Sequence, residues 1–213
     1  MVADFDSQVA KVKSPSKLAH VVLRTNNFEP MVNFYKNFLG AKAIYENDFL
    51  AFLTYDEEHH RIAIASVPGT IAKNQKTCGL EHIAFSFDTL SDLLIAYRQR
   101  KQKGIEPLWP VNHGPTTSIY YRDPDGNQIE TQVDNFANPD DATEFMKSSL
   151  FAENPIGTDF DPEDFITRLQ NGESEETLQK RAEMGPRGIP AFLVWMSVNW
   201  LVLVQILLTV GDM

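Results

Sequence analysis

Apolar and polar positions follow the same order in two stretches of the chain. Each stretch opens with a strand-like run, continues with an apolar face at helical spacing and reaches a glycine before the next strand-like run. The first is KLAHVVLRTNNFEPMVNFYKNFLGAKA from Lys17, and the second is GLEHIAFSFDTLSDLLIAYRQRKQKGIEP from Gly79. The helical faces are Met31, Phe34, Tyr35 and Phe38 in the first copy and Leu90, Leu93, Leu94 and Tyr97 in the second. Gly40 and Gly104 follow them and favour helix ends, because glycine adopts the left-handed conformation there.

Two further strand patterns follow each helix. They are DFLAFLTYD and HRIAIASV in the first copy, and TTSIYYRD and NQIETQVD in the second. The turn RDPDGNQ contains Pro-Asp-Gly, which indicates a hairpin. Each copy is therefore one βαβββ unit, over residues 17–69 and 79–134. We expect an α+β domain over residues 17–134, in which the two tandem units form one curved mixed sheet around a metal-binding cup.

The segments outside this domain differ from it in composition. Residues 1–16 form a polar N-terminal arm. Residues 135–188 predict a helical extension that packs on the domain or on a partner chain. In it, FDPEDFITRLQNG indicates a helix with Asp161 at the N-cap and Pro162 at the first position, and SEETLQKR indicates a shorter helix capped by Ser174.

The C-terminal segment 189–213 is strongly apolar. Its run AFLVWMSVNWLVLVQILLTV, residues 191–210, contains no charge and is about long enough to span a bilayer. It is compatible with a membrane tail anchor. Asn199 and Gln205 near the middle of a span are costly, so a helix buried on this domain or on a second subunit is an equal alternative. An atypical terminus is the third alternative.

The net charge and the cysteine content limit the classes of binding partner and the cellular compartment that we expect. The chain has 213 residues and a net charge of −10. It contains no basic run or basic aromatic surface, so we expect no nucleic-acid binding. The single cysteine, Cys78, cannot form an intrachain disulfide. A reducing compartment follows, and we expect a cytoplasmic protein, tail-anchored if residues 191–210 enter a membrane.

Two histidines and one glutamate are the candidate metal ligands. His20 and His82 hold equivalent positions in the shared pattern Leu-x-His-aliphatic, so the repeat predicts that they lie close together. Glu130 lies inside NQIETQVD, and a carboxylate that faces the cup needs a charge partner or a metal. Two imidazoles and one carboxylate with open positions form the ligand set of non-haem Fe(II) oxygenases, and they also accept Mn(II). Ala63 is the first-copy counterpart of Glu130, which favours three protein ligands.

These residues resemble a known family. Residues 17–134 resemble the vicinal oxygen chelate superfamily, which includes glyoxalases, bleomycin-resistance proteins and dioxygenases. Within it they resemble the type I extradiol dioxygenases, which cleave catechols and biphenyl diols. The strings that carry the resemblance are HHRIAIA, NHGPTTSIYY and RDPDGNQIE. It implies Fe(II) at His20, His82 and Glu130, O2 as co-substrate and a catechol-type diol as substrate.

The resemblance also implies roles for three further side chains. His60 would be the catalytic acid–base, and His113 and Tyr120 would hydrogen-bond the substrate. Two alternatives stay open: another metal-dependent enzyme of this fold, such as a glyoxalase-like isomerase or a thiol transferase, and a small-molecule-binding module. A homo-oligomer is compatible with a single module.

The adjacent histidines His59 and His60 pose a separate question, because neighbours in a strand point to opposite faces. Strict alternation back from Ala63 would send His59 into the cup. The family resemblance selects His60. Because a bulge at the start of a strand shifts alternation by one residue, we expect His60 to be the working histidine.

Overall fold

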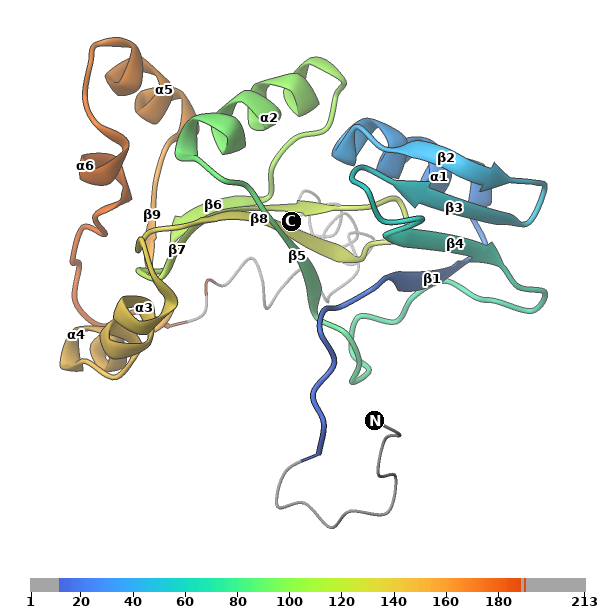
Figure 1. Ribbon diagram of the computed structural model, residues 1–213, viewed down its shortest axis with the longest axis horizontal. Helices are drawn as coiled ribbons and strands as arrows, with labels where there is room; N and C mark the ends of the chain where they lie inside the picture. The colour runs from blue at the N-terminus through green and yellow to red at the C-terminus, as the bar shows by residue number, and fades with distance from the viewer. Residues whose placement is uncertain (1–11, 189, 191–213) are drawn as a thin grey trace, which may run out of the picture.

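The computed structural model describes residues 12–188 and residue 190, and each repeat in it folds as one strand, one helix and three strands (Figure 1). The first repeat contains β1 Val21–Thr25, α1 Phe28–Leu39, β2 Lys42–Glu46, β3 Leu50–Thr54 and β4 Ile62–Ser66. The second contains β5 His82–Ser86, α2 Leu90–Gln102, β6 Trp109–Asn112, β7 Thr116–Arg122 and β8 Gln128–Asp134. The α+β class and the tandem order of elements are thereby confirmed.

Within the described residues the strands form two mixed sheets, in the orders β1-β4-β3-β2 and β5-β8-β7-β6-β9. The first strand of each repeat pairs in parallel with the last, and the remaining pairs are antiparallel. The prediction of one continuous curved sheet is therefore corrected. Each repeat completes its ladder internally, which leaves β1 and β5 as outer strands of separate sheets.

The two helical faces supply much of the core. In α1 the buried residues are Met31, Val32, Tyr35 and Phe38, and in α2 they include the four predicted residues. Side chains of both repeats belong to one apolar cluster, which also takes in Phe165, Ile166 and Leu178 of the extension. Gly40 and Gly104 have φ values of 63° and 74°, as expected for the glycines that follow these helices.

The extension contains α3 Pro139–Met146, α4 Ser149–Glu153, β9 Thr158–Asp159, α5 Pro162–Gln170 and α6 Glu175–Gln179. The predicted caps are present: the Asp161 side chain accepts a hydrogen bond from the Glu163 amide, and the Ser174 side chain accepts one from the Thr177 amide. Helices α5 and α6 pack against α2. The short strand β9 was not predicted, because two residues are too few to show a period.

Arg100 of α2 is a buried charge at the junction of the two repeats. It is 3% exposed, its guanidinium carbon lies 4.0 Å above the Phe38 ring, and its Nε donates to the Phe38 carbonyl at 2.9 Å. Burial lowers its pKa. We expect Arg100→Ala to lower the free energy of unfolding by about 3 kcal/mol, because the cavity and the orphaned carbonyl add to the lost packing. Urea unfolding should show a much smaller loss for Arg98→Ala, which removes a half-exposed arginine from the same helix.

None of the helices described here has both the length and the apolar character needed to cross a membrane. The predicted segment 191–210 and most of the N-terminal arm lie outside the described residues. A membrane tail, the domain boundaries and a homo-oligomer therefore stay predictions.

Candidate active site

A row of side chains crosses the second sheet, one from each of the strands β5, β8, β7 and β6. The register sets Ala84 of β5 opposite Glu130 of β8, Glu130 opposite Tyr120 of β7, and Tyr120 opposite Trp109 of β6. Directly opposed residues share a face of a sheet, and so does His82, two residues before Ala84. The His82 Nε2 atom lies 3.0 Å from Glu130 Oε2. We call His82, Glu130, Tyr120 and Trp109 the second-repeat row.

Electrostatics keep the carboxylate of this row ionised. Glu130 is 5% exposed. Burial by itself raises the pKa of Glu130, but hydrogen bonds from His82 and Ser118 and the nearby imidazoles lower it overall. The hydrogen bond with Glu130 in turn raises the pKa of His82. The pair is thus an anionic carboxylate beside an imidazole, which attracts either a proton or a metal cation.

His113 extends the second-repeat row through a hydrogen bond with Tyr120, in which His113 Nε2 lies 3.0 Å from Tyr120 Oη. Burial raises the pKa of Tyr120, and the charge of Glu130 and a hydrogen bond to it raise it further. The phenol therefore stays protonated at neutral pH and can donate a hydrogen bond. Trp109 stacks on Tyr120 with ring centroids 5.3 Å apart. Four of the six predicted site residues are brought together here.

In the first repeat, His60 rather than His59 packs against His20, the predicted metal ligand of that repeat. The His60 ring centroid lies 4.3 Å from that of His20 and 4.8 Å from that of Phe52. The His59 side chain is 69% exposed. Burial lowers the pKa of His60, and the charge of His20 adds to this effect. Strand β4 begins only at Ile62, so its alternation does not extend back to the two histidines.

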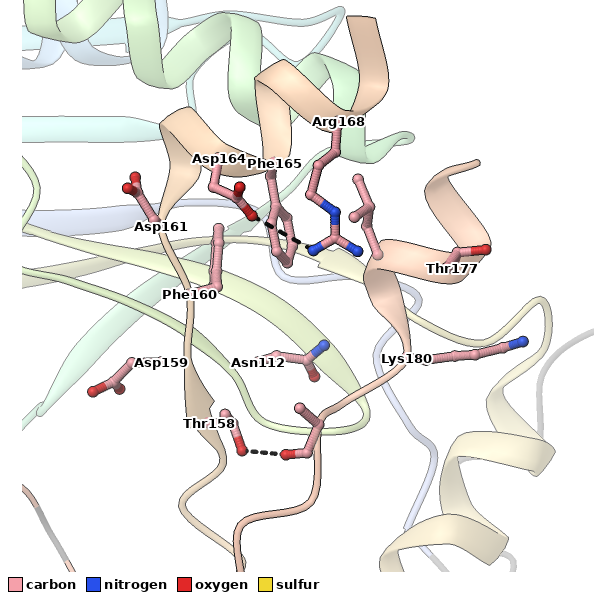
Figure 2. A pocket seen from close by; sticks show the side chains of 12 residues that line it. Asn112, Thr158, Asp159, Phe160, Asp161, Asp164, Phe165, Arg168, Thr177 and Lys180 are labelled. Atoms are coloured by element: carbon pink, nitrogen blue, oxygen red, sulfur yellow. Dashed lines mark hydrogen bonds and ion pairs between the residues drawn. The ribbon is translucent and has the colours of Figure 1, made fainter. Parts of the chain in front are cut away.

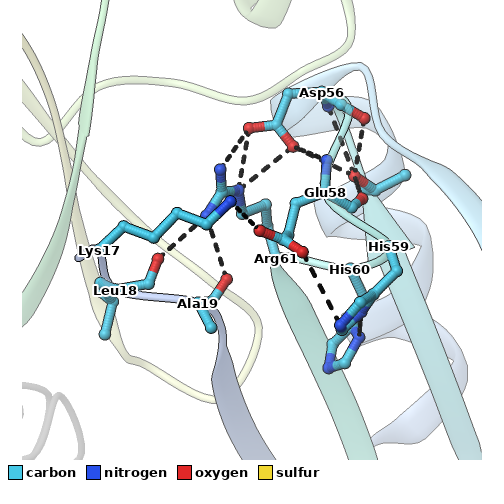
Figure 3. A network of polar contacts seen from close by, with 9 residues as sticks. Lys17, Leu18, Ala19, Asp56, Glu58, His59, His60 and Arg61 are labelled. Atoms are coloured by element: carbon cyan, nitrogen blue, oxygen red, sulfur yellow. Dashed lines mark hydrogen bonds and ion pairs between the residues drawn. The ribbon is translucent and has the colours of Figure 1, made fainter. Parts of the chain in front are cut away.

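Arg61 ties the chain before β1 to the turn before β4 (Figure 3). Its Nε donates to Asp56 Oδ2 at 2.9 Å, and its Nη1 donates to the carbonyls of Leu18 and Ala19 at 3.0 and 3.2 Å. These two carbonyls directly precede His20. The arginine therefore sets where the backbone of His20 lies relative to the neighbouring histidine pair.

The three predicted metal ligands are not assembled as one group. Across residues 12–188 and 190, no three His, Cys, Asp or Glu side chains lie close enough together to hold a metal ion. His82 and Glu130 are in contact, whereas His20 precedes β1 in the other sheet and contacts His60. The ligand set therefore remains a prediction, of which the structure groups two members.

The repeat equivalence behind that prediction is present in the register. Val22 and Ala84 each lie two residues after a repeat histidine. Val22 pairs with Ala63, and Ala84 pairs with Glu130. Ala63 is therefore the structural counterpart of Glu130, and it has no carboxylate to offer.

Several contributors were missed by sequence reasoning. Trp109 lies in the strand-like run before His113, so its position could have been found from periodicity. Arg61 adjoins the histidine pair but looked like an ordinary charged residue. The carbonyl of Ile156 accepts from His113 Nδ1 at 2.6 Å. A backbone carbonyl leaves no mark in the sequence, so that contact could not have been predicted.

A hollow of about 380 Å³ lies where the extension meets the second sheet (Figure 2). Its walls include Asn112 of β6, Thr158 of β9, Phe165 of α5 and Leu178 of α6. The Asn112 Nδ2 atom donates to the carbonyl of Gln179 at 2.9 Å. The extension is thus attached directly to the strand that leads to His113.

Fold and site together define a class of protein: an α+β module of two tandem βαβββ units with a buried carboxylate beside an imidazole in the second. The chain belongs to the Glyoxalase/Bleomycin resistance protein/Dioxygenase superfamily, whose family model matches residues 17–131. The resemblance inferred from the repeats and motifs is thereby confirmed.

Relatives of the chain within this superfamily are of two kinds, dioxygenases and lyases. Biphenyl-2,3-diol 1,2-dioxygenase 2 of Rhodococcus globerulus is 50% identical over 147 residues, which are 68% of this chain and 77% of that protein. Biphenyl-2,3-diol 1,2-dioxygenase 3 of the same organism is 46% identical over 168 residues, 78% of this chain and 88% of that protein. A lactoylglutathione lyase of Neisseria meningitidis serogroup B is 27% identical over 121 residues, 54% of this chain and 88% of that protein.

Proposed function

We propose that the protein is an Fe(II)-dependent extradiol dioxygenase, which uses O2 to cleave a catechol-type aromatic diol beside its hydroxyls. The observation that carries the proposal is the contact group of His82, Glu130, Tyr120 and His113 in a chain that is 50% identical over 147 residues to a biphenyl-2,3-diol 1,2-dioxygenase. Both dioxygenase relatives match at least two thirds of this chain, which supports the proposal.

The chemistry of the row suits an iron ion. Two ligand atoms bound at about 2.1 Å and at right angles to each other lie about 3 Å apart. His82 Nε2 and Glu130 Oε2 are 3.0 Å apart, and the lowered pKa of Glu130 keeps it anionic. When bound, Fe(II) would supply Lewis acidity that lowers the pKa of the diol oxygens, together with open positions for diol and O2.

His20 is the third ligand in this proposal, with Mn(II) as the alternative ion. It is the repeat equivalent of His82, and the pairing of the two first strands with the two last strands supports that equivalence. His20 is exposed and its neighbour β1 is an outer strand of its sheet, as β5 is of the other. The position of the first repeat that is equivalent to Glu130 offers no fourth ligand, because Ala63 stands there.

The remaining site residues have roles that follow from their protonation. Because burial lowers the pKa of His60, its imidazole is neutral near pH 7 and can take a proton from the diol and return it later. Tyr120 keeps its proton for a hydrogen bond within the site, and its hydroxyl oxygen would accept a hydrogen bond from a diol hydroxyl. His113 would orient that hydroxyl through their 3.0 Å contact.

The rival functions differ in what they require of the site. A glyoxalase-like isomerase or thiol transferase, or a binding module, would not need His60, His113 and Tyr120 as a set. The similarity to lactoylglutathione lyases is lower and spans only about half of this chain. The dioxygenase therefore fits the residues best.

The experiment is metal analysis of the purified full-length protein together with oxygen uptake. Iron-loaded protein with a reductant should consume O2 with members of a catechol and biphenyl-diol panel and form a yellow ring-cleaved product. Protein stripped of metal and reloaded with Zn(II) is the control. Absence of uptake with every diol, despite full iron loading, would redirect the assignment to an isomerase, a transferase or a binding module.

A further inference from the structure

The short segment 156–159 of the extension lies directly against the strand that leads to His113. Its β9 residues pair with β6, with Asn112 opposite Thr158 and Val111 opposite Asp159. Gly157 is the point of closest approach. It has a φ of 102°, and a Cβ atom there would come within 2.3 Å of the Asn112 carbonyl oxygen. Only glycine lets the two backbones approach this closely.

The close approach of this segment fixes the hydrogen-bonding role of one ring nitrogen of His113. The Nδ1 atom lies 2.6 Å from the Ile156 carbonyl oxygen. A carbonyl only accepts hydrogen bonds, so Nδ1 must carry the proton and donate it. In the neutral ring, Nε2 is then an acceptor, 3.0 Å from Tyr120 Oη, where it competes with the Glu130 carboxylate for the single hydroxyl proton of Tyr120. The extension thus selects the tautomer that His113 presents to Tyr120.

A second contact of the segment acts on Tyr120 through Trp109. Asp159 Oδ1 accepts from Trp109 Nε1 at 2.6 Å, and the Trp109 ring stacks on Tyr120 at an interplanar angle of 24°. The Arg187 Nη2 atom donates to the other oxygen of Asp159 at 2.8 Å. The segment therefore contacts His113, which faces the Tyr120 hydroxyl, and Trp109, which stacks on the Tyr120 ring.

The segment is itself anchored on both sides. The side chain of Arg181 is 2% exposed, and its guanidinium donates to the carbonyls of His113 at 3.1 Å, Asn154 at 2.7 Å and Leu150 at 3.2 Å. The Thr158 hydroxyl donates to the Ala182 carbonyl at 2.6 Å (Figure 2). These hydrogen bonds fix the position of the Ile156 carbonyl relative to β6.

We propose that segment 156–159 is a positioning element of the active site: the Ile156 carbonyl holds His113 as its Nδ1-protonated tautomer, and Asp159 holds Trp109 against Tyr120. The catalytic consequence rests on the proposed dioxygenase function, whereas the tautomer does not. A hydroxyl aimed by two fixed partners spends more time in its productive orientation.

The test compares Gly157→Ala with Gly172→Ala in the full-length protein. Both positions have a positive φ, of 102° and 90°, but a Cβ at Gly172 meets nothing within 4 Å. The two changes therefore share the backbone strain, and only Gly157→Ala pushes the segment off β6. The first readout is ¹⁵N NMR of the five histidines in the metal-free, diamagnetic chain, which reports the tautomer of each ring.

We expect wild type and Gly172→Ala to show His113 with a protonated Nδ1, and Gly157→Ala to lose that signature. In the iron-loaded enzyme, kcat should fall by about 10- to 100-fold for Gly157→Ala with unchanged metal content and a smaller change in KM. Gly172→Ala should stay within about twofold of wild type. Arg181→Met, which removes the three hydrogen bonds to backbone carbonyls without adding backbone strain, should shift the tautomer signal and kcat in the same direction and serves if Gly157→Ala fails to fold.

Two results would overturn the proposal. One is a wild-type His113 protonated on Nε2. The other is a Gly157→Ala or Arg181→Met protein that keeps both the signature and the kcat of the Gly172→Ala control. If no diol is turned over by wild type but Gly157→Ala loses the signature, the positioning stands and the dioxygenase assignment fails.

Discussion

Replacing Glu130 by alanine is expected to abolish metal loading and to lower turnover by more than about 100-fold, since loss of a residue that merely supports a metal ligand already costs 10- to 100-fold. Glu130 is the anionic member of the predicted ligand set and contacts His82 at 3.0 Å. Without it the site offers only neutral imidazoles, which hold Fe(II) weakly once the charge is gone. Metal content per chain and oxygen uptake with a diol measure the two effects separately.

The matched control is Gln132→Ala, two residues further along β8 on the same face, which should keep its metal and most of its activity. His20→Ala is the companion variant, and it should also lose metal if the first repeat supplies the third ligand. A metal content equal to wild type in Glu130→Ala would refute the ligand assignment. Circular dichroism confirms that a variant is folded before its metal content is compared.

The second large effect is expected for His60→Ala. Turnover should drop by about 100- to 10,000-fold, the usual contribution of a general acid–base group, while iron content stays near that of wild type. The physical reason is that the His60 ring packs on His20 and Phe52, whereas His59 is largely exposed. Single-turnover oxygen uptake and iron analysis on the same preparations measure both quantities.

His59→Ala is the control, because it removes the neighbouring imidazole from the same turn. We expect only a few-fold change, since His59 contacts the ring of His60 without contacting the candidate ligands. If His59→Ala is the crippled variant instead, alternation from β4 extends further back than the structure shows.

Much of the site could be predicted because the chain repeats itself. The pattern Leu-x-His-aliphatic marks equivalent first strands, and the register then sets Ala84 opposite Glu130. His82 and Glu130 meet because both lie on that local ladder. His113 and Tyr120 are also close in sequence, at the end of one hairpin strand and inside the next, so hairpin geometry brings them together.

Other parts of the site could not be predicted from one sequence. The Ile156 carbonyl lies 43 residues beyond His113, and every residue has a carbonyl. The close approach of Gly157 depends on where the extension crosses β6, which no periodicity encodes. The same holds for Arg61, whose partners before β1 are more than 40 residues away.

The amino-acid pattern alone is sufficient for the helices and strands of the two repeats, the tandem units and the superfamily, because these depend on residues near one another along the chain. Only the tertiary structure decided the division of the strands into two sheets, the separation of His20 from the His82–Glu130 pair and the contact of His113 with the Ile156 carbonyl. Those features depend on distances between segments far apart in sequence. Such distances follow from how the edges β1 and β5 and the extension pack, and hydrophobic periodicity carries no information about that packing.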